Sequence, residues 1–205
     1  MRDNELIIKN IIKKIENLDY VFVKLRESFP RLNNGEDIDI FTTQRKPLFE
    51  NILSVLQEEI IDESIKIKIL NRKSKDVITL IKDYKILLKF EIYFSLSELR
   101  NLSVKDSIIS NIVYQFNTKY LDKELIYKVP NDIYECLIRY IDFSENFFYH
   151  PDKKRHLDYL DKLIKEKKVN ENKFFKKLYY FVSFSNNYNH SEKNFLLKKY
   201  DSTIN

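Results

Sequence analysis

Residues Tyr20 to Phe41 read YVFVKLRESFPRLNNGEDIDIF, and the rest of the fold can be worked out from them. The run over 20–25 is β-branched and aromatic, which predicts a strand. Residues 28–36 hold a proline, two asparagines and the only glycine of the chain, so we expect a loop that ends in a turn. Residues 37–41 alternate polar and apolar side chains, the pattern of a strand with one covered face.

The flanking residues extend this pattern on both sides. Isoleucines recur at helical spacing over 3–17, and Pro47 suits the first turn of a helix that runs to about Glu59. Three further strands are expected at 65–69, 77–81 and 86–94, with a hairpin turn at 82–85.

The second half of the chain has a different sequence pattern, in which helical spacing dominates. Residues 96–110 fit no single pattern, and 120–129 could form a short hairpin. Helices are expected at 131–147, 152–168, 171–184 and 191–200. The sequence therefore predicts an α+β protein, in which residues 1–95 form an α/β core with a small mixed sheet and residues 96–205 form a mainly helical domain.

Composition excludes several classes of site. The 205 residues include 36 Lys or Arg and 31 Asp or Glu, and the net charge of +5 comes from interleaved charges, which is typical of a solvated surface. With one glycine there is no glycine-rich phosphate loop, and the chain has no CxxC or HExxH zinc motif.

Cellular location is also predicted from composition. Cys136 is the only cysteine, so no intramolecular disulfide can form, which suits a reducing compartment. No signal peptide and no apolar run of about 20 residues is visible. We therefore expect a cytoplasmic protein without a membrane span.

The sharpest chemical feature is the pair Asp37 and Asp39. Residues two apart in a strand point to the same face, which places their Cα atoms about 6–7 Å apart. Adjacent carboxylates repel unless a cation lies between them, and Mg²⁺ prefers carboxylate oxygen. Glu91 offers a third carboxylate within an apolar strand, and it would join the pair if the two strands are neighbours. The alternative is that all three acids belong to a solvated strand face.

The order of these elements resembles the nucleotidyltransferase superfamily, which has the polymerase-β-like fold. That family shows a helix, a strand, a loop, a strand with two aspartates separated by an apolar residue, a helix, and a third carboxylate on a later strand. Residues 3–95 follow the same order. The resemblance implies that Asp37 and Asp39 hold Mg²⁺ or Mn²⁺ and that Glu91 is the third acid.

One part of the family pattern is missing. The Gly-Ser pair that usually follows the first strand is replaced by Leu25-Arg26-Glu27-Ser28. The Leu-Arg variant resembles a branch found among bacterial surface-polysaccharide proteins, and a weaker similarity links the chain to choline-phosphate transferases. Arg26 could clamp phosphate, with Ser28 and Lys24 as further phosphate ligands. Equally, Arg26 could pair with Glu27 or Glu36.

Other polar or reactive residues favour structural roles. The cationic stretch from His150 to His156 reads as an exposed first helical turn, in which His156 could bond Asp152. Cys136 lies at helical spacing among apolar residues, which indicates a buried thiol. The C-terminal aromatics are expected to be core residues: Phe174, Phe175, Tyr179, Tyr180 and Phe181.

Three functions follow from these features. The first is a metal-dependent enzyme that transfers a nucleotidyl or related phosphoryl-containing group from a phosphate-containing donor to a small molecule or sugar, as in surface-polysaccharide biosynthesis. The second is a non-catalytic, partner-binding or antitoxin-like protein of the same fold. The third is a nucleic-acid-binding domain, suggested only by the positive charge and the lysine- and tyrosine-rich last helices. We favour the first.

Overall fold

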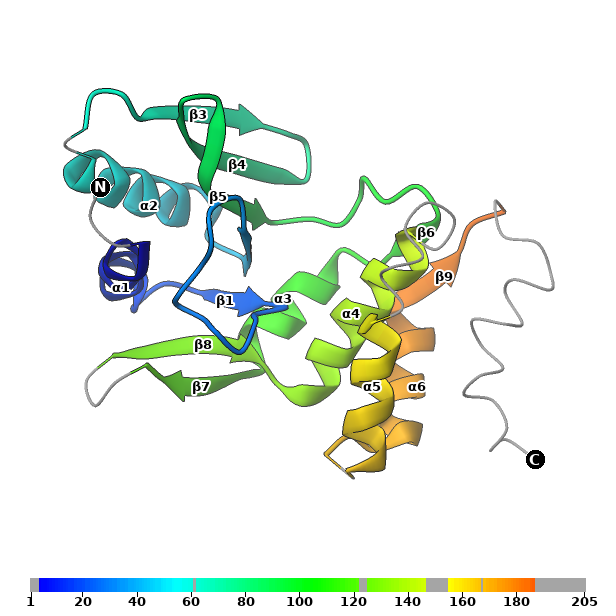
Figure 1. The fold of residues 1–205 in the computed structure, drawn as a ribbon. Coiled ribbons are helices and arrows are strands. Elements are labelled where there is room, and N and C mark those ends of the chain that lie inside the picture. The colour runs from blue at the N-terminus through cyan, green and yellow to red at the C-terminus, as the bar shows by residue number, and fades with distance from the viewer. Residues whose placement is uncertain (1–3, 61, 122–124, 147–154, 167, 187–205) are drawn as a thin grey trace. The chain divides into compact units, whose positions relative to one another are not determined.

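The fold is described from a computed structural model, which describes residues 4–60, 62–121, 125–146, 155–166 and 168–186. The chain divides into two compact units (Figure 1). The first unit comprises residues 1–96 and 109–131, and the second comprises 97–108 and 132–205. Helix α3 (Ser107–Tyr114) runs from one unit into the other.

The first unit is built on a mixed five-stranded sheet of order β1-β2-β5-β4-β3. Its strands are β1 (Tyr20–Val23), β2 (Asp37–Thr42), β3 (Lys66–Asn71), β4 (Lys75–Lys82) and β5 (Lys85–Tyr93). Strand β2 pairs with β5 in parallel, and the other pairs are antiparallel. Asp83 and Tyr84 turn the β4–β5 hairpin with positive φ values of 49° and 61°, as a two-residue hairpin turn requires.

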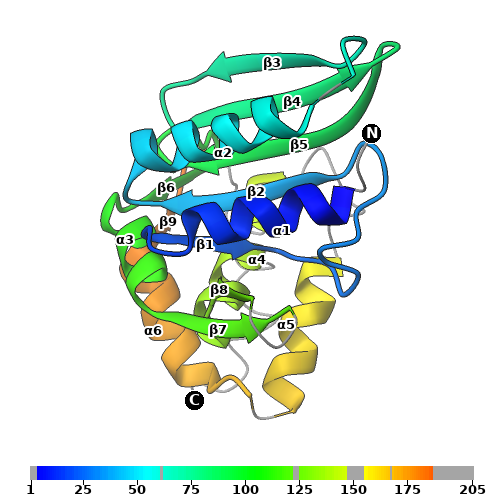
Figure 2. The ribbon, with the colours of Figure 1, turned by 90° about the vertical axis from the view of Figure 1, so that its left-hand side faces the viewer.

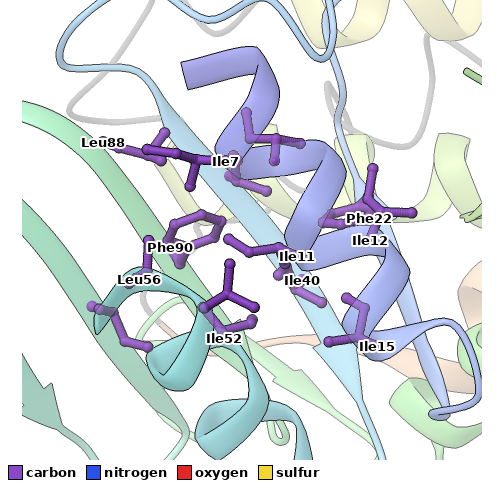
Figure 3. Packing of buried hydrophobic residues seen from close by; sticks show 14 of the residues in the cluster. Ile7, Ile11, Ile12, Ile15, Phe22, Ile40, Ile52, Leu56, Leu88 and Phe90 are labelled. Carbon is purple, nitrogen blue, oxygen red and sulfur yellow. The ribbon is translucent and has the colours of Figure 1, made fainter. Parts of the chain in front are cut away.

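Two helices cover one face of this sheet (Figure 2). Helix α1 (Asn4–Ile15) buries five isoleucines, and helix α2 (Arg45–Glu59) buries an apolar stripe. Figure 3 shows these side chains packed on alternate residues of β2 and β5, with Ile40 and Phe90 among them. Because side chains alternate along a strand, the intervening residues point to the opposite face of the sheet.

A second hairpin also belongs to the first unit. It is formed by β7 (Phe116–Tyr120) and β8 (Ile126–Pro130), which pair antiparallel. Tyr127 of β8 packs its ring 5.2 Å from that of Phe29, and Lys128 Nζ donates to the Leu18 carbonyl at 2.6 Å. These contacts hold the hairpin to the β1 side of the unit.

The second unit is mainly helical. It contains α4 (Asp132–Asn146), α5 (Arg155–Lys165) and α6 (Glu171–Phe181), with a short antiparallel ribbon of β6 (Leu102–Val104) and β9 (Val182–Phe184). The Asn170 side chain caps α6 by accepting from the Lys173 N–H at 3.0 Å.

The sequence predicted this α+β arrangement, with the sheet in the N-terminal half and helices in the C-terminal half. Two local predictions are wrong. The helix predicted at 171–184 ends at Phe181, because residues 182–184 pair with β6 as strand β9. The hairpin begins earlier than predicted, at Phe116. The helix expected at 191–200 lies outside the described residues.

Glu145 at the end of α4 organises the start of β6. Its carboxylate accepts from the backbone N–H groups of Arg100, Asn101 and Leu102 at 2.6, 2.9 and 3.1 Å. We expect Glu145→Ala to lower the free energy of unfolding by about 2 kcal/mol, since these charge-assisted bonds are lost. Urea denaturation followed by circular dichroism measures this. Asp158→Ala, at an exposed position on α5, is the control and should stay within about 0.5 kcal/mol of wild type.

Candidate functional site

The pairing of β2 with β5 brings the three predicted acids together. In this parallel register Asp39 lies opposite Glu91, and Asp37 lies opposite Lys89. Neighbouring strands are about 4.8 Å apart, so the carboxylates of Asp39 and Glu91 are adjacent on the face of the sheet that α1 and α2 leave uncovered. The strand of Glu91 is therefore the neighbour of the strand of Asp37 and Asp39, as the sequence argument required for the three acids to come together.

Asp39 is more deeply buried than Asp37. Its side chain is 11% exposed, and Lys24 Nζ lies 2.6 Å from Oδ2. The other oxygen, Oδ1, is buried and has no hydrogen-bond partner among the described residues. Burial raises the pKa of Asp39 above its ordinary value, and the neighbouring carboxylates add to the rise against the opposing effect of Lys24.

Lys24 reaches Asp39 from an unusual backbone conformation. It directly follows β1 and has a φ of 54°, in the left-handed region that non-glycine residues rarely adopt. This conformation costs about 1 kcal/mol. The sequence predicted a strand over 20–25 that includes Lys24, and this is wrong for Lys24, because β1 ends at Val23 and the chain turns at the next residue.

Glu91 has a different environment, with three donors on its carboxylate. Lys89 Nζ lies 2.5 Å from Oε1, and the Lys75 ammonium and the Tyr93 hydroxyl both donate to Oε2. Although burial alone would raise the pKa of Glu91, the hydrogen bonds from Lys75, Lys89 and Tyr93 lower it to about 2. Glu91 is therefore a stably ionised carboxylate.

Asp37 is the most accessible of the acids, at 54% side-chain exposure. Its Oδ2 is 3.7 Å from Lys89 Nζ, a distance of charge attraction rather than a hydrogen bond. The site thus contains three carboxylates and three ammonium groups, so its formal charge is zero: Asp37, Asp39, Glu91, Lys24, Lys75 and Lys89.

The residues that could hold a divalent cation are Asp37 and Asp39. The buried, unpartnered Oδ1 of Asp39 and the accessible carboxylate of Asp37 are hard oxygen donors that suit Mg²⁺. Within the described ranges, no group of three or more His, Cys, Asp or Glu side chains is arranged to hold a metal ion. The fit therefore rests on two carboxylates.

The loop candidates have contacts of their own. Arg26 forms an ion pair with Glu36, which also accepts from the Asn33 N–H at 3.1 Å. The sequence left two roles open for Arg26, a phosphate clamp or an ion pair with Glu27 or Glu36. The structure contains the ion pair with Glu36. Ser28 is exposed, and its carbonyl accepts from the Arg31 N–H at 2.8 Å. Neither contact joins the loop to the carboxylates.

Sequence reasoning missed Lys75, Lys89 and Tyr93. Lys89 and Tyr93 could have been predicted from the sequence, because they lie two residues before and after Glu91 in one strand and so share its face. Lys75 could not be predicted from spacing within one strand, because it lies on β4. Its contact with Glu91 depends on the pairing of β4 with β5, in which Lys75 lies opposite Tyr93.

Candidates in the second unit have structural roles. The prediction of an exposed turn is wrong for His156, which is buried, with Nε2 3.2 Å from Asp142 Oδ2 and Nδ1 3.4 Å from the Arg139 guanidinium. Its predicted partner, Asp152, lies outside the described residues, as do His150 and the rest of that cationic stretch before Arg155. Cys136 is fully buried, as predicted, and burial raises the pKa of its thiol to about 12.

The C-terminal aromatics divide into two groups. Phe174, Phe175 and Phe181 are buried, which confirms them as core residues. The same prediction is wrong for Tyr179 and Tyr180, which are exposed because they lie on the outer face of α6.

None of the described helices is both long and apolar enough to cross a bilayer. No protein-family model matches this chain, and no curated protein is significantly similar to it in sequence.

Proposed function

We propose that this protein is a metal-dependent enzyme that transfers a nucleotidyl or related phosphoryl-containing group to a small molecule or sugar. One observation carries the proposal. Asp37 and Asp39 share the face of β2 opposite α1 and α2, and the register with β5 puts Glu91 beside Asp39, which is the order of acids in the nucleotidyltransferase superfamily. The Leu25-Arg26 variant further suggests an acceptor in surface-polysaccharide biosynthesis.

The electrostatics of the site also support this function. A buried oxygen without a hydrogen-bond partner lowers stability, and Oδ1 of Asp39 is such an oxygen. Such groups, together with a raised carboxyl pKa and a strained residue such as Lys24, are typical of functional sites.

Each residue has a defined task in this chemistry. Asp37 and Asp39 would hold Mg²⁺ or Mn²⁺, which supplies neutralisation of phosphate charge and activation of an acceptor hydroxyl. Lys24, already 2.6 Å from Asp39, stabilises negative charge that develops on the phosphate oxygens. Arg26 and Ser28 can contribute from the exposed loop, with Arg26 exchanging Glu36 for phosphate.

The proposal is tested by thermal unfolding with Mg²⁺ or Mn²⁺ and a panel of nucleotides. We expect the metal with the correct nucleotide to raise Tm by several degrees, because a ligand at 100 times its Kd stabilises the folded state by about 2.7 kcal/mol. The Asp37→Asn variant should lose this rise. The nucleotide that gives the largest rise identifies the class of donor.

Asp62→Asn is the matched control. Asp62 pairs with Lys82, at the opposite end of β4 from Lys75, so its loss should leave the metal response intact. If wild type and Asp37→Asn respond alike to every metal and nucleotide, the enzyme proposal is wrong. The neutralised cluster would then be a structural ion-pair network, as in the partner-binding alternative.

A further inference from the structure

Glu91 differs from the two aspartates in having both oxygens occupied. Lys89 holds Oε1, while Lys75 and the Tyr93 hydroxyl hold Oε2. Lys75 also donates to the Tyr93 hydroxyl at 3.0 Å, and its ammonium lies 4.7 Å from the centroid of that ring. A metal ion at Glu91 would have to displace these donors and approach two ammonium charges. The Glu91 carboxylate is therefore placed to bind the ammonium groups of Lys75 and Lys89 rather than a metal ion.

The two lysines keep capacity for another ligand. An ammonium group carries three N–H donors. The contacts described for Lys75 use two of them, on Glu91 and Tyr93. Lys89 uses one on Glu91, and its 3.7 Å separation from Asp37 is too long for a hydrogen bond. Their side chains are 17% and 27% exposed.

We propose that Lys75 and Lys89, held in place by Glu91, are the cations that bind the phosphate oxygens of the substrate. Glu91 is then a positioning residue rather than a metal ligand. The inference rests on the proposed function, because it takes Asp37 and Asp39 as the place of the divalent cation.

The register of the sheet explains why this pair suits phosphate. Lys89 lies opposite Asp37, so an oxygen bound by Lys89 lies beside the aspartates. Lys75 lies on β4, the neighbouring strand on the other side, so the two ammonium groups approach Glu91 from different strands. Because Glu91 already orders both side chains, less conformational entropy is lost when an anion binds.

The proposed phosphate binding by Lys75 and Lys89 is tested by isothermal titration calorimetry, in which inorganic pyrophosphate is titrated into the full chain without divalent metal. We expect Lys75→Met and Lys89→Met each to weaken binding at least about tenfold, since each loses a charge-assisted bond to the anion. Lys82→Met, which removes a lysine paired with Asp62, is the control and should bind as wild type does. Wild-type affinity in both site variants would overturn the inference.

The positioning role of Glu91 is tested by Mn²⁺ binding, followed by electron paramagnetic resonance. We expect Glu91→Gln to keep a Kd for Mn²⁺ within about threefold of wild type. The double variant Lys75→Met/Glu91→Gln preserves the local charge balance and gives the same test if Glu91→Gln alone folds poorly.

The outcomes separate this inference from the proposed function. Loss of Mn²⁺ binding in both Glu91 variants, with binding intact in wild type and in Asp62→Asn, would make Glu91 a metal ligand and overturn the inference alone. A wild-type chain that binds no Mn²⁺ would overturn the proposed function together with the inference.

Discussion

Asp39→Asn is expected to raise the thermal stability of the protein and to abolish the metal-dependent activity that we propose for it. The ionised Asp39 carboxylate is buried with one unpartnered oxygen, and burial raises its pKa. The folded state therefore keeps this carboxyl protonated to a higher pH than the unfolded chain, whose pKa is the ordinary 3.8, so a charge on Asp39 destabilises the folded state at higher pH. Asparagine removes that charge at nearly the same volume. At pH 7 and without divalent metal, we expect Tm to rise by roughly 2–4 °C, the shift that about 1 kcal/mol gives a chain of this size.

The same substitution should lower the proposed transfer activity about 10³-fold or more, because it would remove a ligand of a cation that stabilises the transition state by several kcal/mol. Scanning calorimetry and a product assay with the donor identified by thermal shift measure the two effects. The sign of the stability change also depends on pH. The gain should shrink as pH falls through the raised folded-state pKa of Asp39, and it should disappear below 3.8, where the carboxyl is protonated in both the folded and the unfolded chain.

Asp62→Asn serves again as the control. Asp62 is paired with Lys82, and that contact lowers its pKa, so its loss should not stabilise the fold. A lower Tm for Asp39→Asn at neutral pH would contradict the prediction. It would show that the ion pair with Lys24 outweighs the cost of burying the carboxylate.

Glu91→Gln should have the opposite effect on stability. The substitution leaves the ammonium groups of Lys75 and Lys89 without their carboxylate while they remain mostly buried. Removal of one partner from a buried ion pair costs about 3–5 kcal/mol, and we expect a loss of about 3 kcal/mol in the free energy of unfolding. Urea denaturation at pH 7 measures it.

The pH dependence gives a second test of this network. The folded-state pKa of Glu91 is lowered to about 2 from an ordinary 4.5, so its ionisation stabilises the fold above pH 4.5. That contribution is lost as pH falls from 4.5 toward 2. The stability difference between wild type and Glu91→Gln should therefore be constant near neutrality and shrink in acid. A difference that stays the same down to pH 3 would contradict the role given to these ion pairs.

Local sequence patterns determined most of the elements of the first unit. Isoleucine spacing predicted α1, and the alternation of residues 37–41 predicted that Asp37 and Asp39 share a face of β2, because the period of a strand is fixed by backbone geometry alone. The turn at 82–85 was also predicted, since a two-residue hairpin loop depends only on its own conformation.

Pairing over long distances in the chain decided the rest of the site. Glu91 lies beside Asp39 only because β5 inserts between β2 and β4, and Lys75 reaches Glu91 only through the register of β4 with β5. The late strand β9 is a similar case, since residues 182–184 leave their helical pattern to pair with β6. The sequence by itself determined which acids share a strand face, because that follows from the two-residue period of the backbone. The tertiary structure alone decided which cations neutralise them, because an ion pair between strands depends on sheet order and register.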